Sequence, residues 1–369
     1  MLLFFCALFF LGLFVFPFAQ RFFITEKGTI SLPRLDLFSS AFLCLSIVLG
    51  GTFMYATHTE LPIYTWIIIL LLLGGLFCFT QKELDLFKTN LIRLLLCVIG
   101  VFGVLLPMPN ASFSYWLAGG ILTVVWFLGW RLISNFDKYP LTSYVVSSSW
   151  TVALLMVGFV VKTFPSEIVF FATVLGISIF VISTKRLTYG FSNLGAWTSE
   201  ISGFIWSGIW TIFLLQSSVV ILVLIYGYYF VEMTVLLVEY LKKRQLKTLL
   251  LQSLVDDKKR KKAIYYVFIH VVIMAFLAAA LPILNAGPNM TVYATLLLGG
   301  AICCNLYNHL KNPDRSLGSW REIFSELKTG VSELPKASKA FAKEVKSGLK
   351  TQSRKKKVSG KKKGVKKKK

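Results

Sequence analysis

Continuous apolar runs of about 20 residues recur along most of this 369-residue chain. A run of this length crosses the hydrocarbon core of a bilayer as an α-helix. The runs do not alternate between apolar and polar residues, so they are not the strands of a membrane β-barrel. Only 15% of the residues are charged, whereas soluble domains have about 25%. We therefore predict an all-α, polytopic membrane protein.

The apolar runs predict about eleven transmembrane helices. We place them at residues 1–20, 36–56, 62–79, 91–107, 113–133, 143–161, 165–184, 200–216, 218–240, 264–284 and 290–308. Lysine and arginine gather in the loops on one side, with a cluster from Lys242 to Lys262, whereas the loops on the other side contain only Lys162. Positively charged loops face the cytoplasm. This predicts an N-terminus outside and a C-terminus in the cytoplasm.

The chain divides into three parts by composition. Residues 1–308 form the transmembrane helical domain, and residues 309–350 carry apolar residues at helical spacing that predict amphipathic helices on the membrane surface. Residues 351–369 contain eleven lysine and arginine residues and no acidic residue. Such a segment is disordered by its own repulsion. Anionic lipid head groups of the cytoplasmic leaflet are a nearer partner for this tail than nucleic acid.

One stretch between two apolar segments, Asn193 to Gly203, carries a motif. Its spacing resembles the Gly-Asp-x-Gly-Ser element of the polyprenyl-phosphate N-acetylhexosamine-1-phosphate transferases. These are the membrane enzymes of the phospho-N-acetylmuramoyl-pentapeptide transferase and UDP-GlcNAc:undecaprenyl-phosphate GlcNAc-1-phosphate transferase type. Gly195 and Ser199 fall on the glycine and serine of that element, and Gly203 on a later glycine. Ala196 stands where the family has an aspartate.

Two further positions extend the resemblance. Asp137 matches the first aspartate of an element that follows the family's fifth span, but Pro140 replaces the second. On the residues alone, Asp137 could equally mark a solvated turn that is closed by the proline. Glu232 in the ninth predicted span resembles an apolar-apolar-Glu element of the family, and we expect it to make a structural hydrogen bond inside the bundle.

The resemblance implies the transfer of a phospho-sugar from a UDP-sugar to undecaprenyl phosphate, with Mg²⁺ held by carboxylates. The family's adjacent aspartates would fall within residues 80–82, where this chain has none, and the loop from 241 to 263, which carries a histidine in the family, has no histidine. Asp137 is thus the one matched catalytic candidate. The substrate-binding candidates are Asn135, Lys138, Lys185, Arg186, Gly195 and Ser199. We expect no metal ligands and no cofactor, with Mg²⁺ required only if the chain is an active enzyme.

Three functions remain open from the sequence. The leading interpretation is a catalytically silent member of this transferase type in a bacterial-type inner membrane, which binds lipid phosphate or acts as a scaffold or regulator. Polyprenyl phosphate and other membrane lipids would be its partners, and its oligomeric state is open. The first alternative is an active sugar-1-phosphate transferase with an altered site. The second is a transporter or flippase subunit, for which the predicted spans offer few polar residues.

Overall fold

A computed structural model confirms the all-α prediction for the residues that it describes. Those residues are 2–25, 29–57, 86–105, 113–160, 166–216, 226, 228–229, 231–233, 237, 254–255, 257–283, 300 and 306. The predicted span at 62–79 and most of the spans at 218–240 and 290–308 lie outside them, as do residues 309–369. Within the described ranges the one β-type pairing is an isolated bridge between Ile24 and Ile30.

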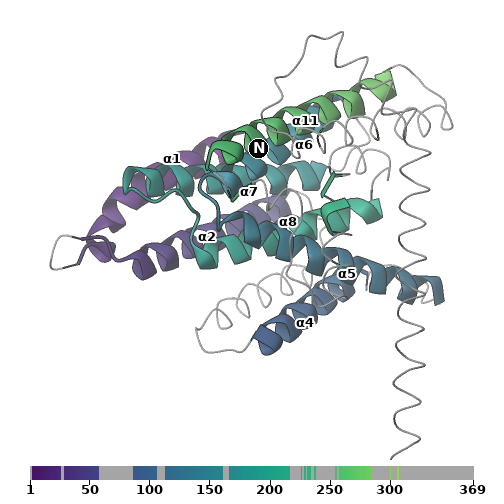
Figure 1. The fold of residues 1–369 in the computed structure, drawn as a ribbon, viewed down its shortest axis with the longest axis horizontal. Coiled ribbons are helices and arrows are strands. Elements are labelled where there is room, and N and C mark those ends of the chain that lie inside the picture. The colour runs from purple at the N-terminus through teal and green to yellow at the C-terminus, as the bar shows by residue number, and fades with distance from the viewer. Residues whose placement is uncertain are drawn as a thin grey trace, which may run out of the picture.

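Eight helices make up the described bundle (Figure 1). They are α1 (Leu2–Phe23), α2 (Leu32–Thr57), α4 (Leu86–Leu105), α5 (Phe113–Phe136), α6 (Thr142–Val160), α7 (Ser166–Thr188), α8 (Ala196–Gln216) and α11 (Asp257–Ile283). Six of them are long and apolar enough to cross a membrane: α1, α2, α5, α6, α7 and α11. The described part of the chain is therefore that of a multi-pass membrane protein.

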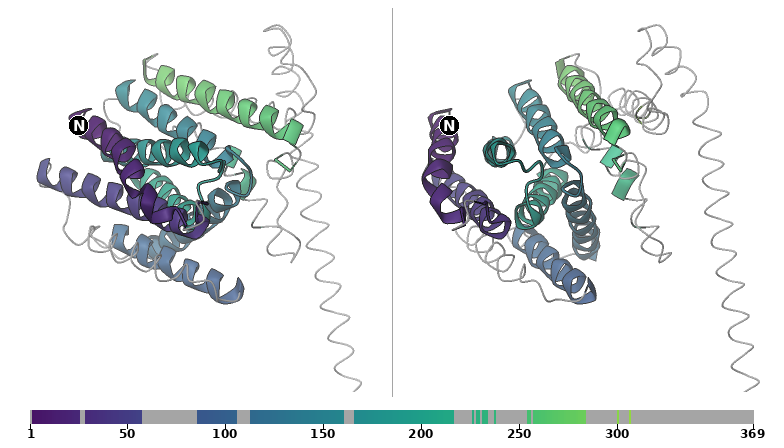
Figure 2. Two further views of the ribbon diagram at one scale, coloured as in Figure 1. Left: turned by 90° about the vertical axis from the view of Figure 1, so that its left-hand side faces the viewer. Right: turned by 60° about the vertical axis from the view of Figure 1, so that its left-hand side comes forward.

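The helix α7 lies in the middle of the bundle, where it packs against α1, α2, α6 and α8. On one side α8 packs along α5, and α5 in turn carries α4 (Figure 2). On the other side α11 lies at the edge of the bundle and packs mainly on α6 (Figures 1 and 2). This arrangement brings the α5–α6 turn and the α7–α8 loop together.

Buried tryptophans tie the helices to one another. Trp150 of α6 is fully buried, and its ring lies 5.3 Å from that of Trp206 and 4.9 Å from that of Trp210, both on α8. Such edge-to-face aromatic pairs add stability beyond the area that they bury. Trp126 of α5 fits against glycines on α4 and α8 and donates a hydrogen bond from Nε1 to the Phe204 carbonyl at 2.9 Å. Small residues let these helices approach closely, as is common in membrane bundles.

Candidate functional site

The helix α7 ends in a turn that only glycine forms without strain. Gly190 has a φ of +85° and follows directly after the last helical residues. The backbone N–H of Gly190 donates to the Leu187 carbonyl at 3.0 Å, and that of Phe191 donates to the Arg186 carbonyl at 2.9 Å. This is the Schellman arrangement, in which a left-handed residue lets the last carbonyls of a helix find donors. It turns residues 191–195 back toward the α5–α6 turn.

The Asp137 carboxylate holds the end of this loop. Asp137 lies in the turn between α5 and α6 and is buried. Its Oδ1 accepts a hydrogen bond from the Leu194 N–H at 2.6 Å, and its Oδ2 accepts one from the Gly195 N–H at 3.1 Å. These two amides immediately precede α8, where free N–H groups and the helix dipole favour an anion. The Asp137 carboxylate therefore occupies the place at the N-terminal end of α8 where an anion is favoured.

Burial raises the pKa of Asp137 from an ordinary value of 3.8 to about 6. Removal of the carboxylate from water is the largest cause, because it disfavours the charged form. The N–H groups of Leu194 and Gly195 and the positive charge of Arg186 act in the opposite direction, and Asp36 adds a smaller upward effect. The carboxyl group therefore titrates just below neutral pH.

A second link joins the same two loops. The Leu141 N–H donates to the Ser192 carbonyl at 2.9 Å. Leu141 has a φ of +63°, in the left-handed region that costs a branched residue free energy. The hydrogen bond across the loops accompanies this strained backbone, so the α5–α6 turn and the α7–α8 loop form one connected unit.

Arg186, in the last turn of α7, is the cation of this unit. Its Nη1 lies 2.5 Å from Oδ1 of Asp36 on α2, and its Nε donates to the Asn193 carbonyl at 2.6 Å. Its guanidinium also lies over the Phe191 ring, 5.7 Å from the centroid. The side chain is 2% exposed. Arg186 therefore contacts three groups of the chain: the Asp36 carboxylate, the Asn193 carbonyl and the Phe191 ring.

Gly195 allows the loop to pass this ion pair. It has a φ of +94°. A Cβ atom at this position would collide with Oδ1 of Asp36 and would lie 3.0 Å from Nη1 of Arg186. Only a residue without a side chain satisfies both the backbone angle and the available space. We refer to Asp36, Asp137, Arg186, Asn193 and Gly195 as the loop-junction cluster.

The structure thus brings together three of the candidate site residues: Asp137 and Gly195, which the resemblance matches, and Arg186, a candidate for its charge. Within the described residues, no group of three or more histidine, cysteine, aspartate or glutamate side chains is placed to hold a metal ion. In the loop-junction cluster two carboxylates share a neighbourhood with a guanidinium. The Arg186 guanidinium supplies positive charge to both the Asp36 and the Asp137 carboxylates.

The other predicted substrate-binding residues surround this cluster. Lys138 is exposed beside Asp137, and Lys185 is half-buried beside Arg186. Asn135 donates from Nδ2 to the Arg131 carbonyl at 2.7 Å, and Ser199 donates from Oγ to the Ala196 carbonyl at 3.1 Å. Asn135 and Ser199 therefore bond to the backbone of their own helices, and Lys138 is the exposed one of these four residues.

Glu232 lies apart from the loop junction. It is buried, and its Oε1 accepts a hydrogen bond from the Tyr228 hydroxyl at 2.7 Å. Both residues belong to the segment around 226–233 that packs beside the tryptophans of α6 and α8. One partner of this buried carboxyl group is therefore a tyrosine one helical turn away.

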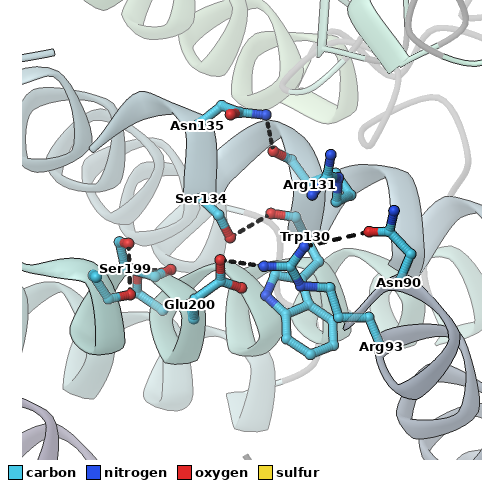
Figure 3. Close-up of polar contacts among 10 residues, drawn as sticks. Asn90, Arg93, Trp130, Arg131, Ser134, Asn135, Ser199 and Glu200 are labelled. Carbon is cyan, nitrogen blue, oxygen red and sulfur yellow. Dashed lines mark hydrogen bonds and ion pairs between the residues drawn. The ribbon is translucent and has the colours of Figure 1, made fainter. Parts of the chain in front are cut away.

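A second, partly buried ion pair, which the sequence interpretation missed, joins α4 to α8 (Figure 3). Arg93 pairs through Nη2 with Oε1 of Glu200, and its guanidinium lies over the Trp130 ring, 5.5 Å from the centroid. Arg93 Nη1 also approaches Oδ1 of Asn90 at 3.5 Å. Both charges belong to apolar helices, Arg93 to α4 and Glu200 to α8. Charges in such positions need partners, so their opposite signs were the available signal.

No family model, curated protein or solved structure matches the chain. The function is therefore inferred from the loop-junction cluster, the neighbouring lysines and the resemblance that the sequence carries.

Proposed function

We propose that this chain is an integral membrane protein of the polyprenyl-phosphate sugar-phosphate transferase type that binds a lipid phosphate but does not transfer a phospho-sugar. In this proposal it acts as a scaffold or regulator of cell-envelope glycan synthesis in a bacterial-type inner membrane. The observation that carries the proposal is the position of Arg186, which is paired with Asp36 and close enough to Asp137 to lower the pKa of that carboxyl group.

Phosphoryl transfer between a UDP-sugar and a lipid phosphate brings several negative charges together, and a divalent cation is the usual means of neutralising them. Mg²⁺ requires an octahedral set of carboxylate oxygens and waters. At the loop junction both Asp137 oxygens already accept backbone hydrogen bonds, and the Arg186 guanidinium would repel a metal ion. These residues therefore do not fit a Mg²⁺ site.

Binding of a phosphate without transfer needs cations that can reach it. Lys138 and Lys185 adjoin the two central residues of the cluster in sequence, and their side chains are exposed and half-buried, respectively. A lysine ammonium binds phosphate as a point charge and needs no metal ion to do so. We assign these two lysines to the lipid phosphate in this proposal.

The test is binding of undecaprenyl phosphate to the full chain purified in detergent, with Mg²⁺ and with EDTA. We expect binding that EDTA leaves unchanged, and a loss of about tenfold or more in affinity when Lys138→Gln and Lys185→Gln are combined. Arg21→Gln is the control, because Arg21 is an exposed cation at the end of α1. Binding of a UDP-sugar that requires Mg²⁺ would favour the active enzyme. An absence of undecaprenyl phosphate binding would overturn the proposal.

The proposal includes an orientation with the loop junction and the start of α11 in the cytoplasm. Its support is the asymmetric distribution of lysine and arginine between alternate loops. In a background without the native cysteines, a cysteine that replaces Arg260 should resist impermeant thiol reagents in intact cells and react after permeabilisation. Strong labelling of intact cells would reverse the orientation.

A further inference from the structure

Three buried polar atoms lack hydrogen bonds where α4, α5 and α8 meet. They are Nε of Arg93, Nε1 of Trp130 and Oε2 of Glu200, and none of them has a hydrogen-bond partner among the described residues. Arg93 is 7% exposed, and Trp130 is fully buried. A buried donor or acceptor without a partner costs about 1–3 kcal/mol. Such atoms are rare in native proteins, so three of them together indicate a place for a bound molecule.

The three atoms belong to side chains that contact one another. Arg93 pairs through Nη2 with Oε1 of Glu200, and its guanidinium lies over the Trp130 ring (Figure 3). The edge of the Trp130 ring that carries Nε1 faces α8, because a Cβ atom at Gly203 would lie 3.1 Å from Cδ1 of Trp130. Gly203 follows Glu200 by three residues and therefore lies on the same face of α8. We refer to Arg93, Trp130 and Glu200 as the α4–α8 polar cluster.

Trp126 shows how the same helix interface satisfies an indole. It lies one helical turn before Trp130 on α5, and its Nε1 donates to the Phe204 carbonyl of α8 at 2.9 Å. The rings of both tryptophans lie 5.0 Å from that of Phe204. Two tryptophans in matching positions thus differ in whether their Nε1 has an acceptor. The missing acceptor is specific to Trp130 and is not a general feature of the packing of α5 on α8.

The chemistry of the three atoms selects the ligand. Arg93 and Glu200 neutralise each other, so the α4–α8 polar cluster does not require a charged partner. Two donors and one acceptor match a hydroxyl group, which can accept two hydrogen bonds and donate one. An anionic oxygen in the same place would accept from both donors, but it would be repelled by the Glu200 carboxylate. A neutral hydroxyl group is therefore the better match.

We propose that the α4–α8 polar cluster binds a hydroxyl group, which accepts from Nε of Arg93 and Nε1 of Trp130 and donates to Oε2 of Glu200. Two sources offer this group: the glycerol head group of a membrane lipid, and water. The Glu200 side chain is 23% exposed, which leaves the cluster open to either source. The site uses no residue of the loop-junction cluster, and the inference does not depend on the proposed function.

The test compares two lipids in nanodiscs that contain the full chain. Phosphatidylglycerol and phosphatidylpropanol have the same charge and a three-carbon head group, but the second has no head-group hydroxyl. The indole N–H signals of Trp126 and Trp130 are followed by NMR in the natural chain, after sequential assignment along α5, so this measurement requires no substitution. We expect the Trp130 signal to shift between the two lipids and the Trp126 signal to stay in place.

A pair of variants tests the same hydrogen bond by lipid retention in native mass spectrometry. Trp130→Phe removes the Nε1 donor and should reduce the preference for phosphatidylglycerol over phosphatidylpropanol about two- to tenfold, as expected for the loss of one hydrogen bond. Trp126→Phe is the matched control and should keep the preference, because its Nε1 donates within the chain. Equal losses in the two variants would overturn the proposal, since ring volume and not Nε1 would then determine the preference.

The NMR measurement separates the two sources of the hydroxyl group. A Trp130 signal that is the same in both lipids but has a cross-peak to water would identify water as the bound group and support the site. A Trp130 signal that ignores the lipid and has no cross-peak to water would overturn the proposal.

Discussion

Arg186 of α7 and Asp36 of α2 are 150 residues apart in the chain and form a partly buried ion pair with 2.5 Å between Nη1 and Oδ1. The same guanidinium donates to the Asn193 carbonyl, so one side chain joins α2, α7 and the loop that leads to α8. This ion pair therefore stabilises the loop junction.

The first prediction concerns this ion pair. Arg186→Gln should lower the free energy of unfolding by about 3–5 kcal/mol, because it leaves the Asp36 carboxylate without its partner. Arg34→Gln should cost less than about 1 kcal/mol, since Arg34 is exposed and its bond to the Phe22 carbonyl is 3.3 Å long. Unfolding in detergent, followed by helix content, provides both values. Equal costs for the two variants would show that the ion pair does not support the junction.

The second prediction compares two glycines that both have a positive φ. Gly190→Ala should cost about 1–2 kcal/mol of stability from its backbone angle alone, because its Cβ would meet no atom within 4 Å. Gly195→Ala should cost more, because its Cβ would also collide with Asp36. In an Asp36→Ala background the additional cost at Gly195 should shrink toward that at Gly190. If the excess persisted in that background, a collision with Asp36 could not be its cause.

The third prediction follows from the raised pKa of Asp137. The folded protein keeps this carboxyl group protonated up to pH of about 6, whereas the unfolded chain ionises it near 3.8. The folded state thus binds more protons between these values, and the stability that Asp137 contributes is present below pH 4 and is lost as the pH rises through 6. Relative to Asp137→Asn, the natural chain should lose about 2–3 kcal/mol of stability between pH 4 and pH 7.

Thermal or denaturant unfolding of both proteins across this range measures the difference. The comparison with Asp137→Asn removes the contributions of all other titrating groups. A difference that stays constant with pH, or that moves in favour of the natural chain as the pH rises, would contradict the raised pKa.

The fourth prediction concerns the ion pair between α4 and α8. Glu200→Gln should cost about 3–5 kcal/mol, because it leaves the Arg93 charge buried without a counter-ion. The double variant Arg93→Met, Glu200→Met should recover much of this loss, since apolar side chains can replace a buried pair at little cost. A double-mutant cycle with the single methionine variants gives the coupling energy. Additive single and double effects would mean that the two charges are not coupled.

The sequence predicted the helices well where apolarity alone defines them. The predicted spans at 113–133 and 143–161 correspond to α5 (Phe113–Phe136) and α6 (Thr142–Val160). At α11 the prediction began at 264, but the helix begins at Asp257. An apolar run marks the part of a helix inside the bilayer, whereas a basic run can continue the same helix beyond it.

The residues of the loop junction could be predicted only in part. The resemblance singled out Asp137 and Gly195, and the positive charge of Arg186 made it a candidate; the three are close together. It could not show that the Asp137 oxygens accept hydrogen bonds from the Leu194 and Gly195 amides. Every residue except proline has a backbone N–H group, so the residue types do not reveal which of these groups donates to a side chain. Asp36 was missed for a different reason: its partner lies 150 residues away, and a single sequence does not record such pairings.

The most direct test of the central claim is a transfer assay with the full chain in detergent, supplied with undecaprenyl phosphate, a UDP-N-acetylhexosamine and Mg²⁺ or Mn²⁺. We expect no release of UMP above that from identically prepared samples without the protein, because the Arg186 guanidinium stands beside the carboxylates that a metal ion would need. Metal-dependent release of UMP that is abolished by Asp137→Asn, in a variant that still folds, would contradict the account and identify an active transferase.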